Sequence, residues 1–104
     1  MSVCMVYITT NSHEEAEIIG RHLVSRKLAA CVNIVGGMKS IYHWQGKIET
    51  AEEIIIIAKT KEALLNEFVE NVKTLHSYDC PCIVAVPIIN GNETFIKWIR
   101  DETK

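Results

Sequence analysis

The chain has 104 residues, of which 48% are hydrophobic and 23% charged, the composition of one folded domain over residues 1–104 rather than of a disordered protein. Eleven basic and thirteen acidic side chains give a net charge of -2 without any concentrated basic stripe, so we expect no nucleic-acid partner. Residues 1–10 carry no basic leader, and no apolar run approaches the roughly 18 residues that span a bilayer. We therefore expect a cytoplasmic protein without a membrane anchor.

The first elements predicted are a strand and a helix. Residues 2–9 are β-branched, aromatic or otherwise apolar without a breaker, which is typical of a strand buried on both faces. Ser12 followed by Glu15 forms a capping box, and the helix it begins runs to about Lys27. The apolar stripe of this helix consists of Ala16, Ile19, Leu23 and Val24.

A long β-hairpin is predicted next. Residues 28–44 read as a strand that Gly36-Gly37 interrupts with a bulge or bend, because paired glycines weaken strand pairing. The chain turns at residues 45–47 and returns as a strand over residues 48–60. Its four consecutive isoleucines, residues 54–57, point alternately to opposite faces, so both faces of the sheet need a cover.

The remainder predicts a helix, a short strand and a final helix. Thr60 is a plausible N-cap for the second helix, which ends near His76. Residues 83–86 form a strand after Pro81, and a turn at residues 90–92 precedes the last helix. The apolar side chains of the two helices are Leu64, Leu65, Phe68, Val72 and Leu75, then Phe95, Ile96, Trp98 and Ile99.

The order β-α-β-β-α-β plus a C-terminal helix predicts an α+β fold of the ferredoxin-like, split βαβ kind. In that fold two helices cover one face of a four-stranded antiparallel sheet and leave the other face bare. The strands have apolar side chains at both sets of alternating positions, so both faces of the sheet are apolar. A monomer would therefore expose a larger apolar patch than soluble monomers tolerate. We expect an obligate oligomer for this reason.

Five segments carry a resemblance to a known family. They are "RKLAACVNI" (26–34), "SIYHWQGKIE" (40–49), "AKT" (58–60), "LHSYDCP" (75–81) and "FIKWI" (95–99). In this order and spacing they resemble the CutA divalent-cation-tolerance family over nearly the whole chain. The resemblance implies a ferredoxin-like homotrimer, a link to copper and other divalent cations, and no established enzymatic activity.

The chain departs from the family pattern at three places. Ser77 stands where the family usually has proline in "HPY", and Cys82 stands where a carboxylate commonly follows the proline. A cysteine that some members carry at the end of the first strand is absent, since residues 8–10 read "ITT". A soft sulfur in place of a hard oxygen favours copper(I) or zinc if the Cys82 side chain reaches a metal site.

Four cysteines raise the question of a metal or redox site. Their spacing does not match a zinc ribbon, and in a reducing compartment we expect free thiols. Cys80-Pro81-Cys82 has the appearance of a site, yet a disulfide between such near neighbours demands strained geometry. The proline is better read as holding the chain extended on its way into an edge strand.

The resemblance implies His76 and Cys31 as candidate metal ligands, and Cys82 is a weaker third candidate. The alternatives stay open. His76 equally suits a helix cap, where its charged form favours the helix dipole, and Cys31 equally suits a small buried strand residue. The resemblance also places Tyr42, Trp44 and Tyr78 in a cleft between subunits, where Lys59 either neutralises an anion or is a solvated charge.

No nucleophile, base and orienting group occur at a familiar spacing, so we do not expect an enzyme. Two functions remain. One is a metal-binding trimer in divalent-cation, especially copper, homeostasis. The other is a PII-like signalling or assembly trimer that holds a small anion or an unidentified partner protein at the subunit cleft. The short turn at residues 45–47 favours the first, because a long glycine-rich loop would be typical of the second.

Overall fold

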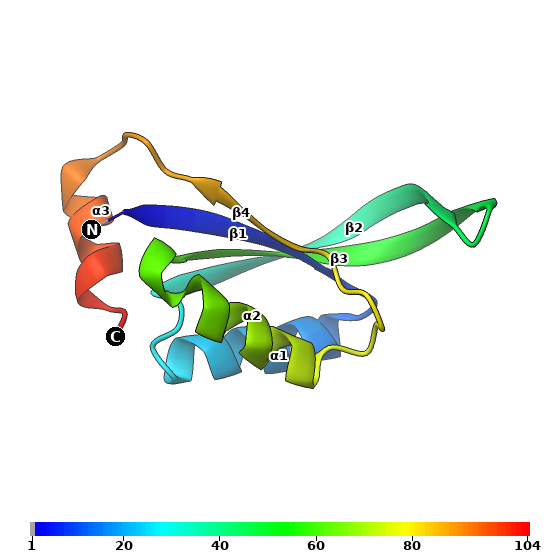
Figure 1. Ribbon diagram of the computed structural model, residues 1–104, viewed down its shortest axis with the longest axis horizontal. Coiled ribbons are helices and arrows are strands. Elements are labelled where there is room, and N and C mark those ends of the chain that lie inside the picture. The colour runs from blue at the N-terminus through cyan, green and yellow to red at the C-terminus, as the bar shows by residue number, and fades with distance from the viewer. Residues whose placement is uncertain (1) are drawn as a thin grey trace.

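The computed structural model describes residues 2–104 and contains one four-stranded antiparallel sheet with strand order β2-β3-β1-β4 (Figure 1). The elements follow the predicted order with the extra C-terminal helix, which confirms the α+β fold. They are β1 (Val3–Thr10), α1 (His13–Ser25), β2 (Cys31–Trp44), β3 (Lys47–Lys61), a 3-10 turn η1 (Glu62–Leu64), α2 (Leu65–Leu75), β4 (Ile83–Pro87) and α3 (Glu93–Asp101).

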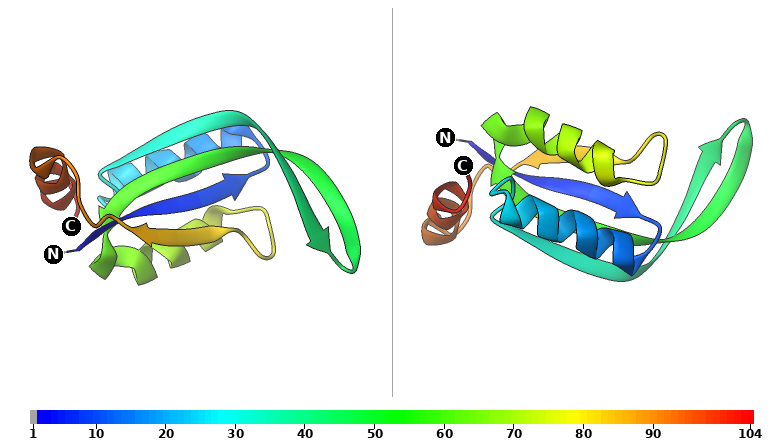
Figure 2. Two further views of the ribbon diagram at one scale, coloured as in Figure 1. Left: turned by 90° about the horizontal axis from the view of Figure 1, so that it is seen from above. Right: turned by 90° about the horizontal axis from the view of Figure 1, so that it is seen from below.

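Helices α1 and α2 lie side by side on one face of the sheet, and the main core fills the space between them and the strands (Figure 2). Alternation along each strand decides which side chains enter this core. Ile54 and Ile56 of β3 are buried beneath the helices, whereas Ile55 and Ile57 point to the other face and are only half buried. The core also contains Val6, Ile8, Ile19, Leu23, Phe68 and Val72.

The helix ends match the sequence in part. The Ser12 side chain accepts a hydrogen bond from the Glu15 backbone N–H at 3.1 Å, as the capping motif predicts. The prediction that Thr60 caps α2 is wrong. Thr60 is a buried residue inside β3, and α2 begins through the 3-10 turn without any side-chain cap, because the strand continues to pair with β1 as far as Lys61. The first helix also stops two residues early, where Lys27 adopts a positive φ of 57°.

The β2–β3 hairpin continues past the rest of the sheet as a long, curved arm (Figure 1). Its register shifts between Val35 and Met38, which confirms the predicted glycine bulge, and Gly37 takes a positive φ of 76°. Gln45 and Gly46 both have positive φ, the signature of a tight two-residue hairpin turn. Ile41 and Ile48 on the arm are 68% and 70% exposed, so the arm has apolar surface with no cover within one chain.

The sheet face opposite the helices is bare, as predicted. It carries exposed apolar side chains from three strands, among them Met5, Val35, Val84 and Val86. Helix α3 lies at the end of the sheet remote from the arm, over a small cluster of Val3, Ala30 and Ile99. Within residues 2–104, no helix has both the length and the apolarity needed to cross a membrane.

Candidate functional site

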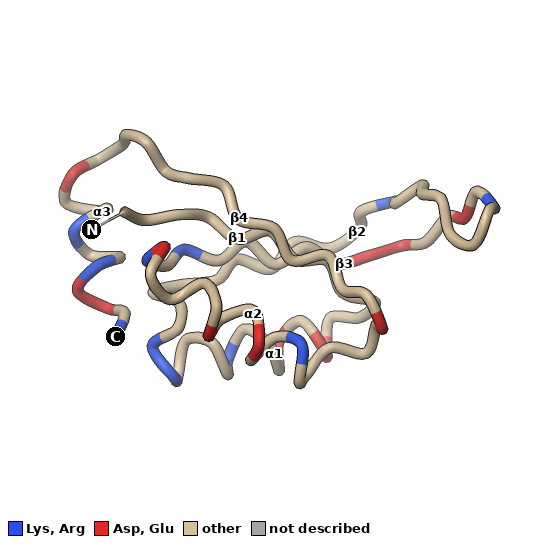
Figure 3. Tube along the Cα trace, in the orientation of Figure 1, with Lys and Arg blue, Asp and Glu red and all other residues tan. Residues whose placement is uncertain are grey.

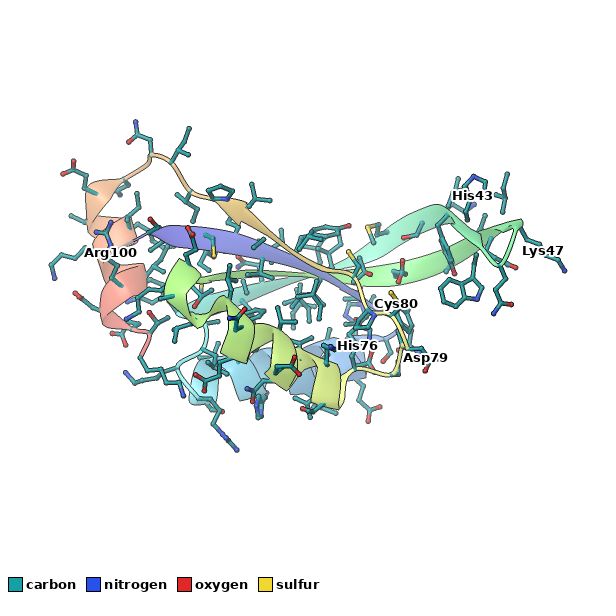
Figure 4. All side chains as sticks on the ribbon, viewed as in Figure 1. His43, Lys47, His76, Asp79, Cys80 and Arg100 are labelled. Atoms are coloured by element: carbon teal, nitrogen blue, oxygen red, sulfur yellow. The ribbon has the colours of Figure 1, made fainter. Side chains whose placement is uncertain are left out.

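A cavity of about 650 Å³ begins at the base of the arm and extends along it. Three parts of the chain line it: the arm from Met38 to Trp44 beside the turn, the end of β1, and the loop between α2 and β4. Figure 4 shows Asp79 and Cys80 of that loop beside the point where the hairpin leaves the sheet, and His43 and Lys47 far out on the arm. The cavity therefore lies where the bulged hairpin leaves the sheet, beside the loop that connects α2 to the edge strand β4.

Aromatic side chains form much of the cavity wall. Tyr42 and Trp44 come from β2, Tyr7 from β1 and Tyr78 from the loop, so four rings from three elements surround one space. Tyr42 is 43% exposed and Trp44 48% exposed, which leaves aromatic surface open towards the cavity mouth. Tyr42, Trp44 and Tyr78 thus line one cavity of a single chain, and the expectation that they lie in a cleft between subunits stays a prediction.

A buried carboxylate forms part of the wall. Glu53 shares a strand face with Ile55 and Ile57, and it directly precedes Ile54, the residue at which β3 begins to pair with β1. The residue is only 7% exposed, and its Oε2 accepts a hydrogen bond from the Tyr78 hydroxyl at 2.8 Å. Its neighbour Glu52 points to the opposite face and is exposed, as alternation requires. Figure 3 shows the acidic stretch of β3 at the start of the arm.

The buried carboxylate affects the two acids nearest to it. Burial, the hydrogen bond to Glu53 and the negative charge of Glu53 raise the pKa of Tyr78 well above its ordinary value, so the phenol stays protonated. Burial and the charge of Glu53 also raise the pKa of the Cys82 thiol, against a smaller lowering by a hydrogen bond to Thr9. Both effects favour the neutral thiol form of Cys82 over the thiolate.

Three sulfur atoms border the same cavity. Cys80 is exposed at the loop, Cys82 is half buried two residues later, and both thiols are free. The third is the thioether of Met38, which accepts a hydrogen bond from the Tyr7 hydroxyl at 3.2 Å. With Glu53 and Asp79, the cavity wall therefore contains two carboxylates, two thiols and one thioether.

His76 lies behind this wall with both ring nitrogens engaged. Its side chain is 0% exposed, its Nε2 is 2.7 Å from the Thr9 carbonyl oxygen, and its Nδ1 accepts the Tyr78 backbone N–H at 3.1 Å. The Glu15 carboxylate holds the same turn, since its Oε1 accepts the Ser77 N–H at 2.9 Å. His76 is the C-cap of α2, as the sequence indicates, and it fixes the loop that carries Tyr78.

Cys31 and Lys59 lie elsewhere on the bare face. They are direct partners in the β2–β3 ladder, and the Lys59 ammonium donates to the Asn33 side chain rather than lining the cavity. Cys31 begins the edge strand β2 and Cys82 directly precedes the opposite edge strand β4, so at least three strand spacings, roughly 14 Å, separate them. The structure thus does not bring His76, Cys31 and Cys82 together in one chain. Among residues 2–104, no three His, Cys, Asp or Glu side chains stand close enough to hold a metal ion.

Sequence reasoning missed Glu53 and Asp79 as members of the site, and it weighed Cys80 only as the partner of Cys82 in a strained disulfide. A signal existed for Glu53, because an acid at the start of an isoleucine run shares a face with two of those isoleucines. Glu53 contacts Tyr78 of the loop between α2 and β4, and the path of that loop is a tertiary feature that spacing along the strand does not predict. In chemical terms, the cavity presents a negative, aromatic-walled space with soft sulfur donors at one side.

The chain is similar to proteins of divalent-cation tolerance. A family model described as "CutA1 divalent ion tolerance protein" matches residues 4–102. The divalent-cation tolerance protein CutA of Archaeoglobus fulgidus is 50% identical over 98 residues, covering 94% of each chain. A chloroplastic CutA 1 of Oryza sativa is 42% identical over 100 residues, covering 96% of this chain and 56% of that protein. The chain thus spans little more than half the length of that plant relative.

Solved structures agree. A divalent cation tolerance protein from Thermus thermophilus superposes with a TM-score of 0.96 at 43% identity, covering 98% of this chain and 99% of the other. A structure described as the periplasmic divalent cation tolerance protein CutA from Archaeoglobus fulgidus gives a TM-score of 0.94 at 45% identity, with 98% and 99% covered. Both likenesses extend over essentially the whole chain.

Proposed function

Because the chain belongs to the CutA1 divalent ion tolerance family, we propose that it binds divalent cations as part of tolerance to them. The observation that carries this proposal is the full-length match to relatives named for divalent-cation tolerance at up to 50% identity. The cavity adds chemical support, since it gathers the carboxylates and thiols that ligate such ions. Copper is our first choice of ion, because thiol and thioether donors favour soft or borderline metals.

The carboxylates and thiols of the cavity are chemical groups that ligate metal ions. Within residues 2–104, however, one chain does not bring three of these groups close enough together to hold an ion. We assign the primary role to Glu53 and Cys82, which face one cavity, and supporting roles to Asp79 and Cys80. Cys31 and His76 remain candidate ligands by family resemblance. Ligation by His76 requires one of its two ring hydrogen bonds to break, so we expect it to act first as a positioning residue for the loop.

We propose that the functional form is a homotrimer. Exposed apolar side chains on the bare face and on the arm support association, because burying each large one contributes roughly 1.5–3 kcal/mol. Association would place the cavity next to a neighbouring chain and bring donors from two copies together. This route explains how an incomplete donor set in one chain becomes a complete one.

The test is a titration of purified, reduced protein with copper(I), copper(II) and zinc, with Cys82→Ser, Glu53→Gln, His76→Ala and Cys31→Ala beside the wild type. We expect the first two variants to lower affinity or stoichiometry most, and the circular dichroism of each variant to show that it is folded. Unchanged binding in all four variants would remove every assigned ligand. Loss of metal binding in Cys31→Ala alone would show that the metal site lies at the other edge of the sheet.

A PII-like trimer that binds a small anion or a partner protein is the second candidate. The observation that favours it is Lys59, a cation on the bare face away from the cavity. We further propose that the protein is not an enzyme and is cytoplasmic. Assays of anion binding and cell fractionation test these points.

A further inference from the structure

The glycine bulge leaves the arm with a weak joint at its root. The β2–β3 ladder passes from Val35 directly to Met38, and residues 36–37 between them are both glycines, which restrain the backbone least. Strand β1 pairs with β3 from Ile54 onwards, so the arm beyond the bulge consists of the two hairpin strands alone. With no further contacts, the arm would be free to swing at this joint.

One contact braces the joint on the helix side of the sheet. Gly36 does not take a positive φ, yet a β-carbon at this position would lie 2.7 Å from both Cε1 and Nε2 of His13. The imidazole ring therefore packs directly against the glycine backbone. The same point lies 3.7 Å from Ile54, which is buried beneath the helices. His13 is the first residue of α1, and Figure 2 shows this end of α1 beside the start of the arm.

A second contact holds the joint on the bare face. The Tyr7 hydroxyl donates a hydrogen bond to the Met38 thioether at 3.2 Å. Met38 is the first residue of β2 to pair with β3 after the bulge, whereas Tyr7 belongs to β1 in the main part of the sheet. Tyr7 alternates with the buried residues Val6 and Ile8, so its side chain lies on the face opposite the helices. The bond therefore ties the root of the arm to the main sheet.

We propose that these two contacts form a clamp that fixes the direction of the arm, with His13 and Tyr7 as its positioning residues. They act on opposite faces of the sheet, so together they resist bending of the arm towards either face. A fixed arm is preorganised, because a swinging arm would lose conformational entropy when its exposed apolar side chains become buried. The clamp is a property of the single chain and depends neither on metal binding nor on the trimer.

Residual dipolar couplings of the backbone amides of the full-length protein test the clamp, because motion of the arm relative to the rest of the molecule lowers the couplings of the arm alone. His13 is an exposed residue, so His13→Ala should fold. We expect this variant to lose coupling magnitude in residues 38–52 and to keep the wild-type couplings in α2. His13→Phe retains a flat ring and should keep the wild-type couplings throughout. His22→Ala is the matched control on α1, because His22 contacts Asn71 of α2 instead and should not affect the arm.

Gly36→Ala tests the same contact from the other side. Its added methyl group displaces the His13 ring, so we expect the arm to lose the same coupling magnitude as in His13→Ala. The double variant should match each single variant, because all three lack one contact. Tyr7→Phe removes the separate hydrogen bond to Met38, so its effect should add to that of His13→Ala.

Ile48→Lys places a charge on the exposed arm and disfavours its burial against a second copy, so the comparison is repeated in that background. Full arm couplings in His13→Ala, both alone and with Ile48→Lys, would overturn the inference. A double variant of His13 and Gly36 that loses more coupling magnitude than either single variant would also overturn it, because the two residues would then act separately. A monomeric wild type would refute the trimer and leave the clamp standing.

Discussion

At the scale of single residues, the contact between Tyr78 and Glu53 sets the chemistry of the cavity. Burial and the nearby carboxylate stabilise the protonated phenol, so the pKa of Tyr78 lies above its ordinary value of about 10. A pKa raised by folding contributes stability below the unfolded value, and this contribution is lost as pH rises through the folded pKa. The stability of the protein should therefore fall as the pH is raised above about 10.

Absorbance at 295 nm checks this directly, because it reports tyrosine ionisation. The chain has three tyrosines, and we expect one of them to ionise at distinctly higher pH than the other two. Tyr78→Phe should remove that late fraction and flatten the loss of stability. A late fraction that persists in the variant would show that the shifted phenol belongs to Tyr7 or Tyr42.

His76 makes a second prediction at this scale. His76→Ala leaves the Thr9 carbonyl and the Tyr78 N–H without their partner and removes a fully buried ring. We expect the free energy of unfolding to fall by about 2–4 kcal/mol. Chemical denaturation at a fixed protein concentration measures the loss, and Lys73→Ala, an exposed residue of the same helix, should change it by less than about 0.5 kcal/mol. Similar values for both variants would refute the positioning role.

The sequence predicts the location of some site residues, but it predicts the role of each residue less well. Tyr42, Trp44 and Tyr78 line one cavity of a single chain, whereas Lys59 lies outside it, and the cleft between subunits stays a prediction. The position of a residue along a strand predicts the sheet face on which its side chain lies and its place along the strand. It does not predict which loop packs against that face. Glu53 was missed for the same reason, since its burial depends on a loop more than twenty residues later in the chain.

At the scale of elements, the hairpin arm depends on its glycine bulge. Gly37 has a positive φ of 76° with open space around its α-carbon, so an alanine there has room but the wrong backbone conformation. Gly37→Ala should lower the free energy of unfolding by about 1–2 kcal/mol. Gly91→Ala is the matched control, because its added methyl group would meet Ile96 at an ordinary 3.5 Å, and we expect little change. Equal effects of the two substitutions would show that the bulge conformation is not required.

The elements themselves were mostly predictable because their signals are local. The capping serine, the glycine pair and the hairpin turn each act within a few residues, and all three were found where expected. Thr60 shows the limit. A threonine before an apolar helix favours capping, but pairing of β3 with β1 continues through Thr60 to Lys61 and overrides that preference.

At the scale of the whole molecule, one chain leaves both a sheet face and an arm without cover. Their exposed apolar side chains make a lone chain unfavourable in water, and this is the physical basis of the proposed trimer. Ile48→Lys on the exposed arm should weaken association, because a charge would have to be buried with it. Sedimentation velocity over a dilution series measures the effect. A sedimentation coefficient that matches the wild type at every concentration would place the interface elsewhere.

Native mass spectrometry tests at once whether the protein assembles and whether it binds divalent cations through the cavity of Glu53 and Cys82. For reduced wild type with zinc or copper, we predict a mass of three 11.8 kDa chains, about 35 kDa, plus bound metal. The Glu53→Gln, Cys82→Ser double variant should keep the trimer mass and lose the metal. A monomeric wild type, or equal metal content in wild type and double variant, would contradict the account.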